Sequence, residues 1–171
     1  ELVGSLRWRL QSLWEQRELL LLEAKECEEQ GRELEATVRE LCKPNELQRY
    51  LLFVGDLEKV VSLLLCLASR LARLHNALSR TGADAEERQS LGERLKLLSQ
   101  QREDAKDLKE NLERRERVVS AILAKYLTEQ QLQDYQHFVQ AKTSLLIEQK
   151  DLEEQMKFLE EQLESLERSI P

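Results

Sequence analysis

Apolar residues recur at alternating steps of three and four along the first forty residues, and this pattern constrains the fold more than any other feature. The positions that follow it are Val3, Leu6, Leu10, Leu13, Arg17, Leu20, Ala24, Cys27, Gly31, Leu34, Val38 and Leu41. A 3.5-residue period places these side chains on one narrow stripe of an α-helix, the seam of a coiled coil. The segment is therefore predicted to be a long helix that packs against another helix.

The stretch from Thr81 to Asp84 predicts the point where the chain reverses. Gly82 suits a left-handed helix end because it has no Cβ to clash there. Asp84 followed by Glu87 predicts a capping box, in which the two side chains bind the free backbone amides of a new helix. A helix end and a helix start so close together favour an antiparallel helical hairpin.

Two further interruptions divide the chain. Pro44 and Asn45 predict a break, with a new helix starting near Glu46. Thr128 opens a Thr-Glu-Gln-Gln sequence that predicts a kink or a restart. We therefore expect an all-α fold, an elongated antiparallel coiled coil of about three long helices in a single domain. The predicted helical segments are 1–42, 46–80 and 85–170. The same seams would also serve an antiparallel homodimer in which two chains exchange arms, and the sequence leaves this alternative open.

The second segment has more apolar residues than one seam can use. The predicted seam, which omits one residue of the heptad between Val54 and Leu57, is Leu47, Leu51, Val54, Leu57, Val61, Leu64, Ala68, Leu71, His75 and Leu78. The apolar residues left off it are Leu52, Phe53, Val60, Leu63, Leu65, Cys66, Leu67 and Leu74. A two-stranded coil covers one stripe only, so we expect a third helix or a partner protein to cover this surface.

The later segments continue the helical pattern. After the predicted turn the apolar stripe runs through Leu91, Leu95, Leu98, Ala105, Leu108, Leu112, Val119 and Ile122, with Arg102 and Arg115 within it. Beyond Thr128 a regular seam runs through Tyr135, Phe138, Lys142, Leu145, Gln149, Leu152, Met156, Leu159, Leu163, Leu166 and Ile170. Both patterns predict further helices that pack along a neighbour.

Composition excludes several classes of function. Charged residues make up 35% of the 171 residues and aromatic residues 5%, with five Gly and two Pro, a profile typical of long helices. A rod of one or two helices has no interior for a substrate cavity, so we expect no enzyme, and neither phosphate-loop motif nor GxGxxG is present. The net charge of −7, with both signs interleaved, disfavours nucleic acid and membrane surfaces.

The cysteines and histidines do not form a metal or catalytic motif. Cys27, Cys42 and Cys66 are widely spaced, without a CxxC pair, and are interpreted as reduced thiols of a cytosolic protein. His75 and His137 have no nucleophile or acid at catalytic spacing on their own helical faces. The N-terminus has no signal-peptide pattern, and the most apolar run is too short to span a membrane. We therefore expect neither secretion nor membrane insertion of this segment. We therefore expect no metal and no cofactor.

One charged region has a more specific interpretation. Residues 106–117 form a dense charge block, and Arg70 and Arg73 lie three residues apart on one face of the preceding segment. The region is either a solvated helix flank or a docking patch whose arginines pair with carboxylates of a partner helix.

A family resemblance favours the docking patch. The residues that carry it are Ser69-Arg70-Leu71-Ala72-Arg73, Asn76-Ala77-Leu78, the run from Gln101 to Arg117, Tyr126-Leu127, Asp134-Tyr135, His137-Phe138-Val139 and Leu145-Leu146-Ile147-Glu148-Gln149. These strings closely resemble the C-terminal domain of the Shroom family, the second Apx/Shroom domain, and the resemblance covers most of the chain.

The resemblance implies a cytoplasmic scaffold module of the cytoskeleton and of apical cell junctions. Such a module binds the coiled coil of Rho-associated kinase, localises the kinase and promotes its activity toward non-muscle myosin II in apical constriction. F-actin binding, and in some members a PDZ domain, belong to regions outside this fragment. The kinase-binding surface implied by the resemblance is Ser69, Arg70, Arg73, Lys109, Glu110, Asn111, Arg114 and Arg115. The alternatives are a self-associating cytoskeletal coiled coil without a kinase partner and a membrane-bending helical module, which the net acidity disfavours.

Overall fold

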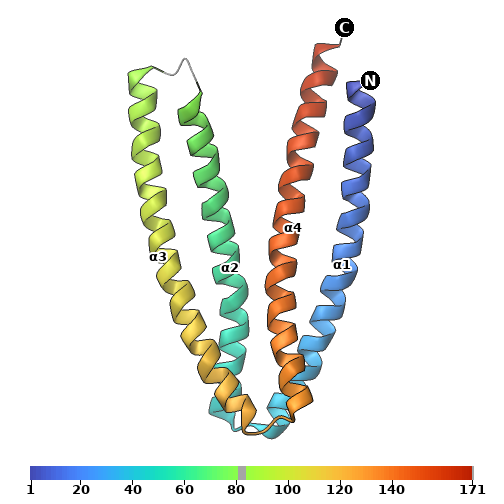
Figure 1. Cartoon of the computed structure of the whole chain (residues 1–171), viewed down its shortest axis with the longest axis vertical. Coiled ribbons are helices and arrows are strands. Elements are labelled where there is room, and N and C mark those ends of the chain that lie inside the picture. Colours follow the sequence, from blue (N-terminus) through green and yellow to red (C-terminus); the bar gives the residue numbers. More distant parts are fainter. Residues whose placement is uncertain (81–83, 171) are drawn as a thin grey trace. The chain divides into compact units, whose positions relative to one another are not determined.

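The computed structural model describes residues 1–80 and 84–170, and within these residues the chain forms four helices and no strand. They are α1 (Leu2–Leu41), α2 (Pro44–Ser79), α3 (Ala85–Ala124) and α4 (Glu129–Ser169) (Figure 1). The predicted all-α class is confirmed. The expectation of about three long helices is wrong, because segment 85–170 is two helices separated at residues 125–128. The predicted turn at Gly82 lies outside the described residues.

The break at Pro44 is confirmed, and the new helix starts at the proline itself. Pro44 occupies the first helical position, where its missing N–H and fixed φ are tolerated. The backbone N–H of Lys43 donates to Oε1 of Glu46 at 2.9 Å, which satisfies an amide just before the helix. The helix thus begins two residues earlier than the predicted Glu46.

The start of α4 explains why the predicted third segment is two helices. The backbone N–H of Gln131 donates to Oγ1 of Thr128 at 3.2 Å, and the backbone N–H of Thr128 donates to Oε1 of Gln131 at 2.9 Å. This reciprocal pair is a capping box, so the chain restarts a helix here rather than bending one. Asp84 caps α3 as expected, since its Oδ1 accepts the backbone N–H of Glu87 at 2.8 Å.

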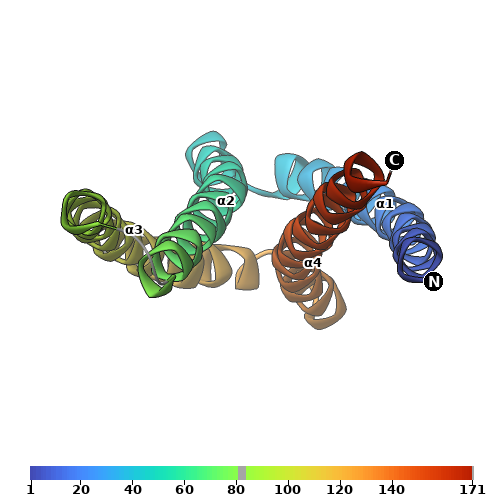
Figure 2. The ribbon, with the colours of Figure 1, turned by 90° about the horizontal axis from the view of Figure 1, so that it is seen from above.

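The chain divides into two units, which are described separately. The terminal unit comprises Glu1–Thr37 and Gln133–Pro171, and the central unit comprises Val38–Leu132. In the terminal unit α1 lies beside α4 (Figures 1 and 2). Arg7 near the start of α1 forms an ion pair of 2.8 Å with Glu167 near the end of α4, so the helices run in opposite directions within this unit. The core residues that they bury together are Leu6, Leu13, Leu152, Met156 and Leu159.

In the central unit α2 lies beside α3 (Figure 2). The ion pair between Asp56 and Arg115 (2.8 Å) joins an early residue of α2 to a late residue of α3. The hydrogen bond from the Tyr126 hydroxyl to Glu46 (2.7 Å) joins the segment just after α3 to the first turn of α2. These two helices therefore also run in opposite directions. Their buried side chains are Tyr50, Phe53, Leu57, Leu67 and Leu71 of α2 and Ala105, Leu112, Val119, Ile122 and Leu123 of α3.

The register of α2 differs from the predicted one. The buried and half-buried residues that form its seam are Tyr50, Phe53, Leu57, Val60, Leu64, Leu67, Leu71, Leu74 and Leu78. They alternate by three and four without interruption, so the predicted gap between Val54 and Leu57 is wrong. The large rings of Tyr50 and Phe53, 3% and 1% exposed, occupy the seam where the prediction had placed the smaller neighbours. As a consequence Ala68 and His75, predicted to be buried, are exposed.

Candidate protein-docking site

The residues predicted to bind a partner all lie in the central unit. On α2, Arg70 and Arg73 are exposed and Ser69 is half-buried. On α3, the exposed members are Lys109, Glu110, Asn111 and Arg114. Lys109 Nζ lies 3.9 Å from Oε1 of Glu113, a loose pair on the helix surface. Most of these side chains are therefore accessible to another protein.

Arg115 forms an ion pair with a residue of the neighbouring helix. Its Nη1 donates to Oδ2 of Asp56 at 2.8 Å, and the two side chains are 37% and 38% exposed. Sequence reasoning missed Asp56, which is 59 residues away, since no local pattern connects it to Arg115. In paired helices, oppositely charged residues that flank the two seams form interhelical ion pairs, and this is the signal that would have found Asp56.

The two groups of predicted residues do not meet at one point. Arg115 is level with Asp56, and Arg70 lies fourteen residues further along α2. At 1.5 Å per residue, Arg70 and Arg115 are offset by about 20 Å along the helix axes. The structure therefore brings the α2 arginines and Arg115 onto neighbouring helices of one unit but at different levels.

Part of the surplus apolar surface on α2 is covered by α3. Leu67 is 4% exposed and Leu74 is half-buried, so the prediction that both lie off the seam is wrong. Leu52 and Leu63 remain 54% and 41% exposed, as expected for residues that no second strand covers. An uncovered apolar surface thus persists on the helix that carries Arg70 and Arg73, although it is smaller than the sequence indicated.

Charge is distributed unevenly between the two units. The terminal unit contains 18 acidic and 9 basic side chains, a net charge of −9, whereas the central unit contains 15 acidic and 17 basic ones, a net charge of +2. The net charge of −7 for the whole chain is the sum of these two values and does not reveal the difference between the units. Arg70, Arg73 and the predicted residues of α3 therefore lie in the one unit that does not repel an acidic partner.

The perturbed titratable groups lie away from these residues. Hydrogen bonds from the Lys43 backbone and then from the Tyr126 hydroxyl lower the pKa of Glu46, and the same hydroxyl bond raises the pKa of Tyr126. Burial raises the pKa of the Cys27 and Cys42 thiols. Cys27, Cys42 and Cys66 are free cysteines. A thiol with a raised pKa is a poor nucleophile, so this chemistry does not point to covalent catalysis.

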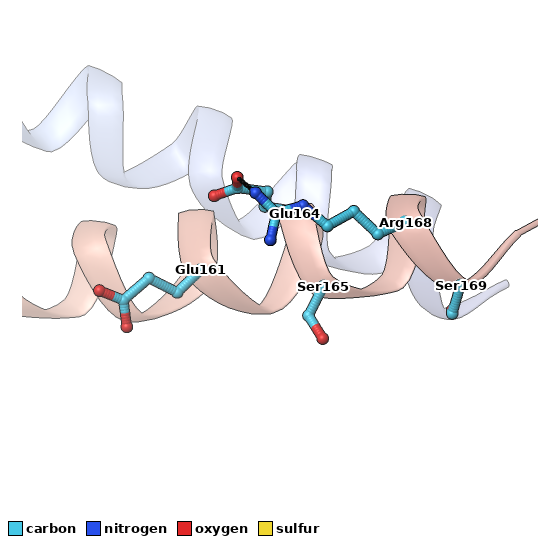
Figure 3. A pocket seen from close by; sticks show the side chains of 5 residues that line it. All are labelled: Glu161, Glu164, Ser165, Arg168 and Ser169. Carbon is cyan, nitrogen blue, oxygen red and sulfur yellow. Dashed lines mark hydrogen bonds and ion pairs between the residues drawn. The ribbon is translucent and has the colours of Figure 1, made fainter.

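Two of the shallow hollows lie on the terminal unit. One of about 360 Å³ is lined by five residues from the last turns of α4, where Glu164 pairs with Arg168 (Figure 3). Another of about 270 Å³ lies between α1 and α4 and includes Cys27 and His137. In the described ranges, no cluster of three or more His, Cys, Asp or Glu residues is placed to hold a metal ion. None of the helices, over the same ranges, is long and apolar enough to cross a membrane.

Comparison with known proteins places the chain in a family. Residues 1–170 match the Apx/Shroom domain ASD2. The chain is 55% identical to Protein Shroom3 of Homo sapiens, 49% identical to Protein Shroom2 of Xenopus tropicalis and 46% identical to Protein Shroom4 of Homo sapiens. These alignments cover 100%, 100% and 99% of this chain and 9%, 10% and 12% of the respective relatives. The chain therefore spans about a tenth of the length of the relatives that it matches. Because the match extends over residues 1–170, the chain belongs to the Apx/Shroom ASD2 domain family.

Proposed function

We propose that this chain is a non-catalytic scaffold module that binds the coiled-coil region of Rho-associated kinase, called the kinase coil below. Binding localises the kinase and promotes its activity toward non-muscle myosin II, in actomyosin contraction and apical constriction. The module acts in the cytoplasm, at the cytoskeleton and apical cell junctions. Membership of the ASD2 family supports the proposal, and F-actin binding belongs to regions outside this chain.

The observation that carries the proposal is the combination of exposed arginines and uncovered leucine on α2. Arg70 and Arg73 are exposed, and Leu63 of the same helix is 41% exposed. Interfaces between helices gain affinity from desolvated apolar residues, while charged groups at their edges fix register and raise the association rate. A basic, leucine-bearing helix suits a coiled-coil partner that supplies apolar residues and carboxylates.

The geometry of each unit fits a coiled-coil module. In both units two long helices run in opposite directions and bury residues at heptad spacing. We propose that these pairs act as antiparallel coiled coils within a single functional domain. Such pairs present long, rigid faces, on which a partner helix can lie with little loss of conformational entropy.

Charge reversal tests the proposal. Arg70→Glu combined with Arg73→Glu should weaken binding of the kinase coil at least tenfold, measured by calorimetry with the purified domain. Arg88→Glu with Lys96→Glu makes the same change of charge on exposed residues of α3 outside the predicted surface, and should alter the affinity less than threefold. Helical circular dichroism should be unchanged in both variants. Undiminished binding of the first variant would refute the role of these arginines.

A self-associating cytoskeletal coiled coil is the second candidate function. It is favoured by exposed apolar residues on α1, where Trp8 is 73% and Leu19 is 62% exposed. This candidate predicts homodimers whose mass does not change when the kinase coil is added. Sedimentation equilibrium of the domain alone and with the kinase coil separates the two, because only the scaffold proposal predicts a heteromeric species.

A further inference from the structure

A groove runs along the terminal unit where α1 and α4 lie side by side (Figures 1 and 2). The hollow of about 270 Å³ between these helices adjoins a second hollow of about 320 Å³. Glu23 of α1 and Glu148 of α4 line both of them, so the two hollows form one groove. Each helix contributes side chains to both hollows, and the groove therefore follows the line along which the helices meet.

Besides four seam residues, the groove is lined by the residues that directly precede the seam positions of each helix. On α1 these residues are Gln16, Leu19, Glu23, Glu26 and Gln30. On α4 they are His137, Ala141, Ser144, Glu148, Asp151 and Gln155. Both sets advance by alternating steps of three and four, so each forms a straight stripe along its helix. Two such stripes offer a third helix the same repeat that a coiled-coil partner has.

The groove carries four carboxylate side chains, those of Glu23, Glu26, Glu148 and Asp151. All four residues are exposed. Among the described residues that line the groove, none is a lysine or an arginine. The side-chain amide of Gln155 donates to Oδ2 of Asp151 at 2.8 Å, and this neutral partner leaves the charge of the carboxylate in place. We call the surface the acidic groove.

The opposite side of the same helix pair has no net charge. At the levels of residues 16–30 and 137–158, the residues that directly follow the seam include three acidic and three basic ones. They are Glu18, Glu28, Glu153, Lys25, Lys150 and Lys157. Of the two sides along which α1 and α4 meet, only the one with the groove is acidic at these levels.

Two large exposed apolar side chains lie on the stripes of the acidic groove. Leu19 is 62% exposed and Phe158 is 59% exposed. Phe158 follows Asp151 by seven residues, so it continues the α4 stripe by two turns, and Asp151 lines the same hollow as Leu19. The two apolar side chains are therefore about 10 Å apart along the helix axes, which is the spacing of positions i and i+7 on a helix.

Other occupants suit this surface poorly. A metal ion is not supported, because in the described ranges no three acidic, Cys or His side chains are placed together to hold one. Nucleic acids and anionic membranes would be repelled by the carboxylates. The terminal unit of a second copy would bring its own net charge of −9 against the same charge.

We propose that the acidic groove is a docking site for one basic amphipathic helix of another protein. The partner helix places apolar residues at positions i and i+7 against Leu19 and Phe158. Its lysine or arginine residues lie next to Glu23 and Glu148, where the charges are complementary. This inference concerns the terminal unit and goes beyond the proposed function, which uses residues of the central unit.

A synthetic helix tests the proposal with the whole domain. The probe is a fluorescent peptide of about three heptads that repeats the sequence Leu-Lys-Lys-Leu-Ala-Lys-Leu. A second peptide has glutamine in place of every lysine. The lysine peptide should bind the domain at least tenfold more tightly in anisotropy titrations, because only this peptide supplies the complementary charge.

Paired variants of the domain locate the charge effect. Glu23→Gln with Glu148→Gln neutralises the two residues common to both hollows, and should weaken binding of the lysine peptide at least tenfold. Glu28→Gln with Glu153→Gln makes the same change of net charge with exposed residues on the opposite side, and should change the affinity less than threefold.

A second pair of variants tests the apolar contacts. Leu19→Ala with Phe158→Ala should weaken binding of the lysine peptide at least tenfold. Leu22→Ala with Ile147→Ala removes side chains that are 58% and 45% exposed and lie on neither stripe, and should change the affinity less than threefold. Because all four side chains are exposed, thermal melts of both variants should stay close to that of the wild type.

Three outcomes would overturn the proposal. The first is a wild-type domain that binds the two peptides equally or binds neither. The second is an equal loss in the two glutamine variants, because net charge alone would then attract the peptide. The third is a wild-type dimer in sedimentation equilibrium that Leu19→Ala with Phe158→Ala dissociates, because a second copy would then occupy the groove. The kinase coil is absent from these measurements, so none of these results bears on the proposed function.

Discussion

Gly31 lies against the ring of Phe138 so closely that no side chain fits between them. An added Cβ would be 2.8 Å and 3.0 Å from two ring carbons, both closer than carbon atoms approach without displacement. Overpacking of this kind costs about 1–3 kcal/mol. The gain in helix propensity from Gly to Ala is about 1 kcal/mol. We therefore expect Gly31→Ala to lower the free energy of unfolding, by up to about 2 kcal/mol in urea titrations.

Gly55 provides the matched control for Gly31. It also lies inside a helix, but an added Cβ would have no atom within 4 Å. Gly55→Ala should therefore raise the stability by about 0.5–1 kcal/mol through helix propensity alone. If both substitutions stabilise the protein equally, α1 does not approach Phe138 as described.

Glu46 should make stability depend on pH in a defined direction. Its carboxylate accepts the Lys43 N–H (2.9 Å) and the Tyr126 O–H (2.7 Å), and these bonds lower its pKa in the folded state. A lowered folded pKa gives stability that is present above the unfolded value, about 4.3, and is lost as pH falls through the folded value. The difference in Tm between wild type and Glu46→Gln should thus shrink between pH 6 and pH 3. A difference that stays constant or grows on acidification contradicts the contact.

The register of α2 gives two of its leucines very different solvent exposures. Leu67 is 4% exposed and Leu63 is 41% exposed. Leu67→Ala should cost about 2–5 kcal/mol, as for other buried leucines. Leu63→Ala should cost less than about 1 kcal/mol, since little packing is lost at an exposed site. Urea unfolding of the two variants measures both values. Equal costs would favour the register inferred from the sequence, in which Ala68 lies on the seam.

The same register shows which parts of the fold the sequence could predict. Thr128 and Asp84 were recognised because each accepts a backbone N–H three residues further on. Pro44 was recognised because its own ring fixes φ and removes a backbone donor. The α2 seam was not predicted correctly, because leucines occupy several sides of the helix and their burial depends on which side packs against α3. For the same reason local strings were enough to nominate the charged residues of the proposed docking site, whereas they could not predict the bond from Arg115 to Asp56. Long-range pairing depends on two segments at once, and periodicity describes only one.

The two units of the molecule differ in net charge, and their stabilities should therefore respond differently to salt. The net charge is −9 in the terminal unit and +2 in the central unit. Repulsion among like charges destabilises a compact state and weakens when salt screens it, since the Debye length falls from about 30 Å at 0.01 M to about 8 Å at 0.15 M. Amide protection in the terminal unit should therefore rise over this range, and protection in the central unit should change little. Hydrogen exchange resolved by residue measures both units in the same sample.

Reducing the charge of the terminal unit separates repulsion from a general effect of salt on helices. Glu26→Lys with Glu161→Lys changes exposed residues of α1 and α4, and lowers the net negative charge of the unit by four. This variant should lose a large part of the salt response in the terminal unit, while the central unit stays as in the wild type. A response of equal size in both units, or one that the two lysines leave intact, would mean that salt acts on helix packing in general. The uneven distribution of charge would then have no effect on the stability of either unit.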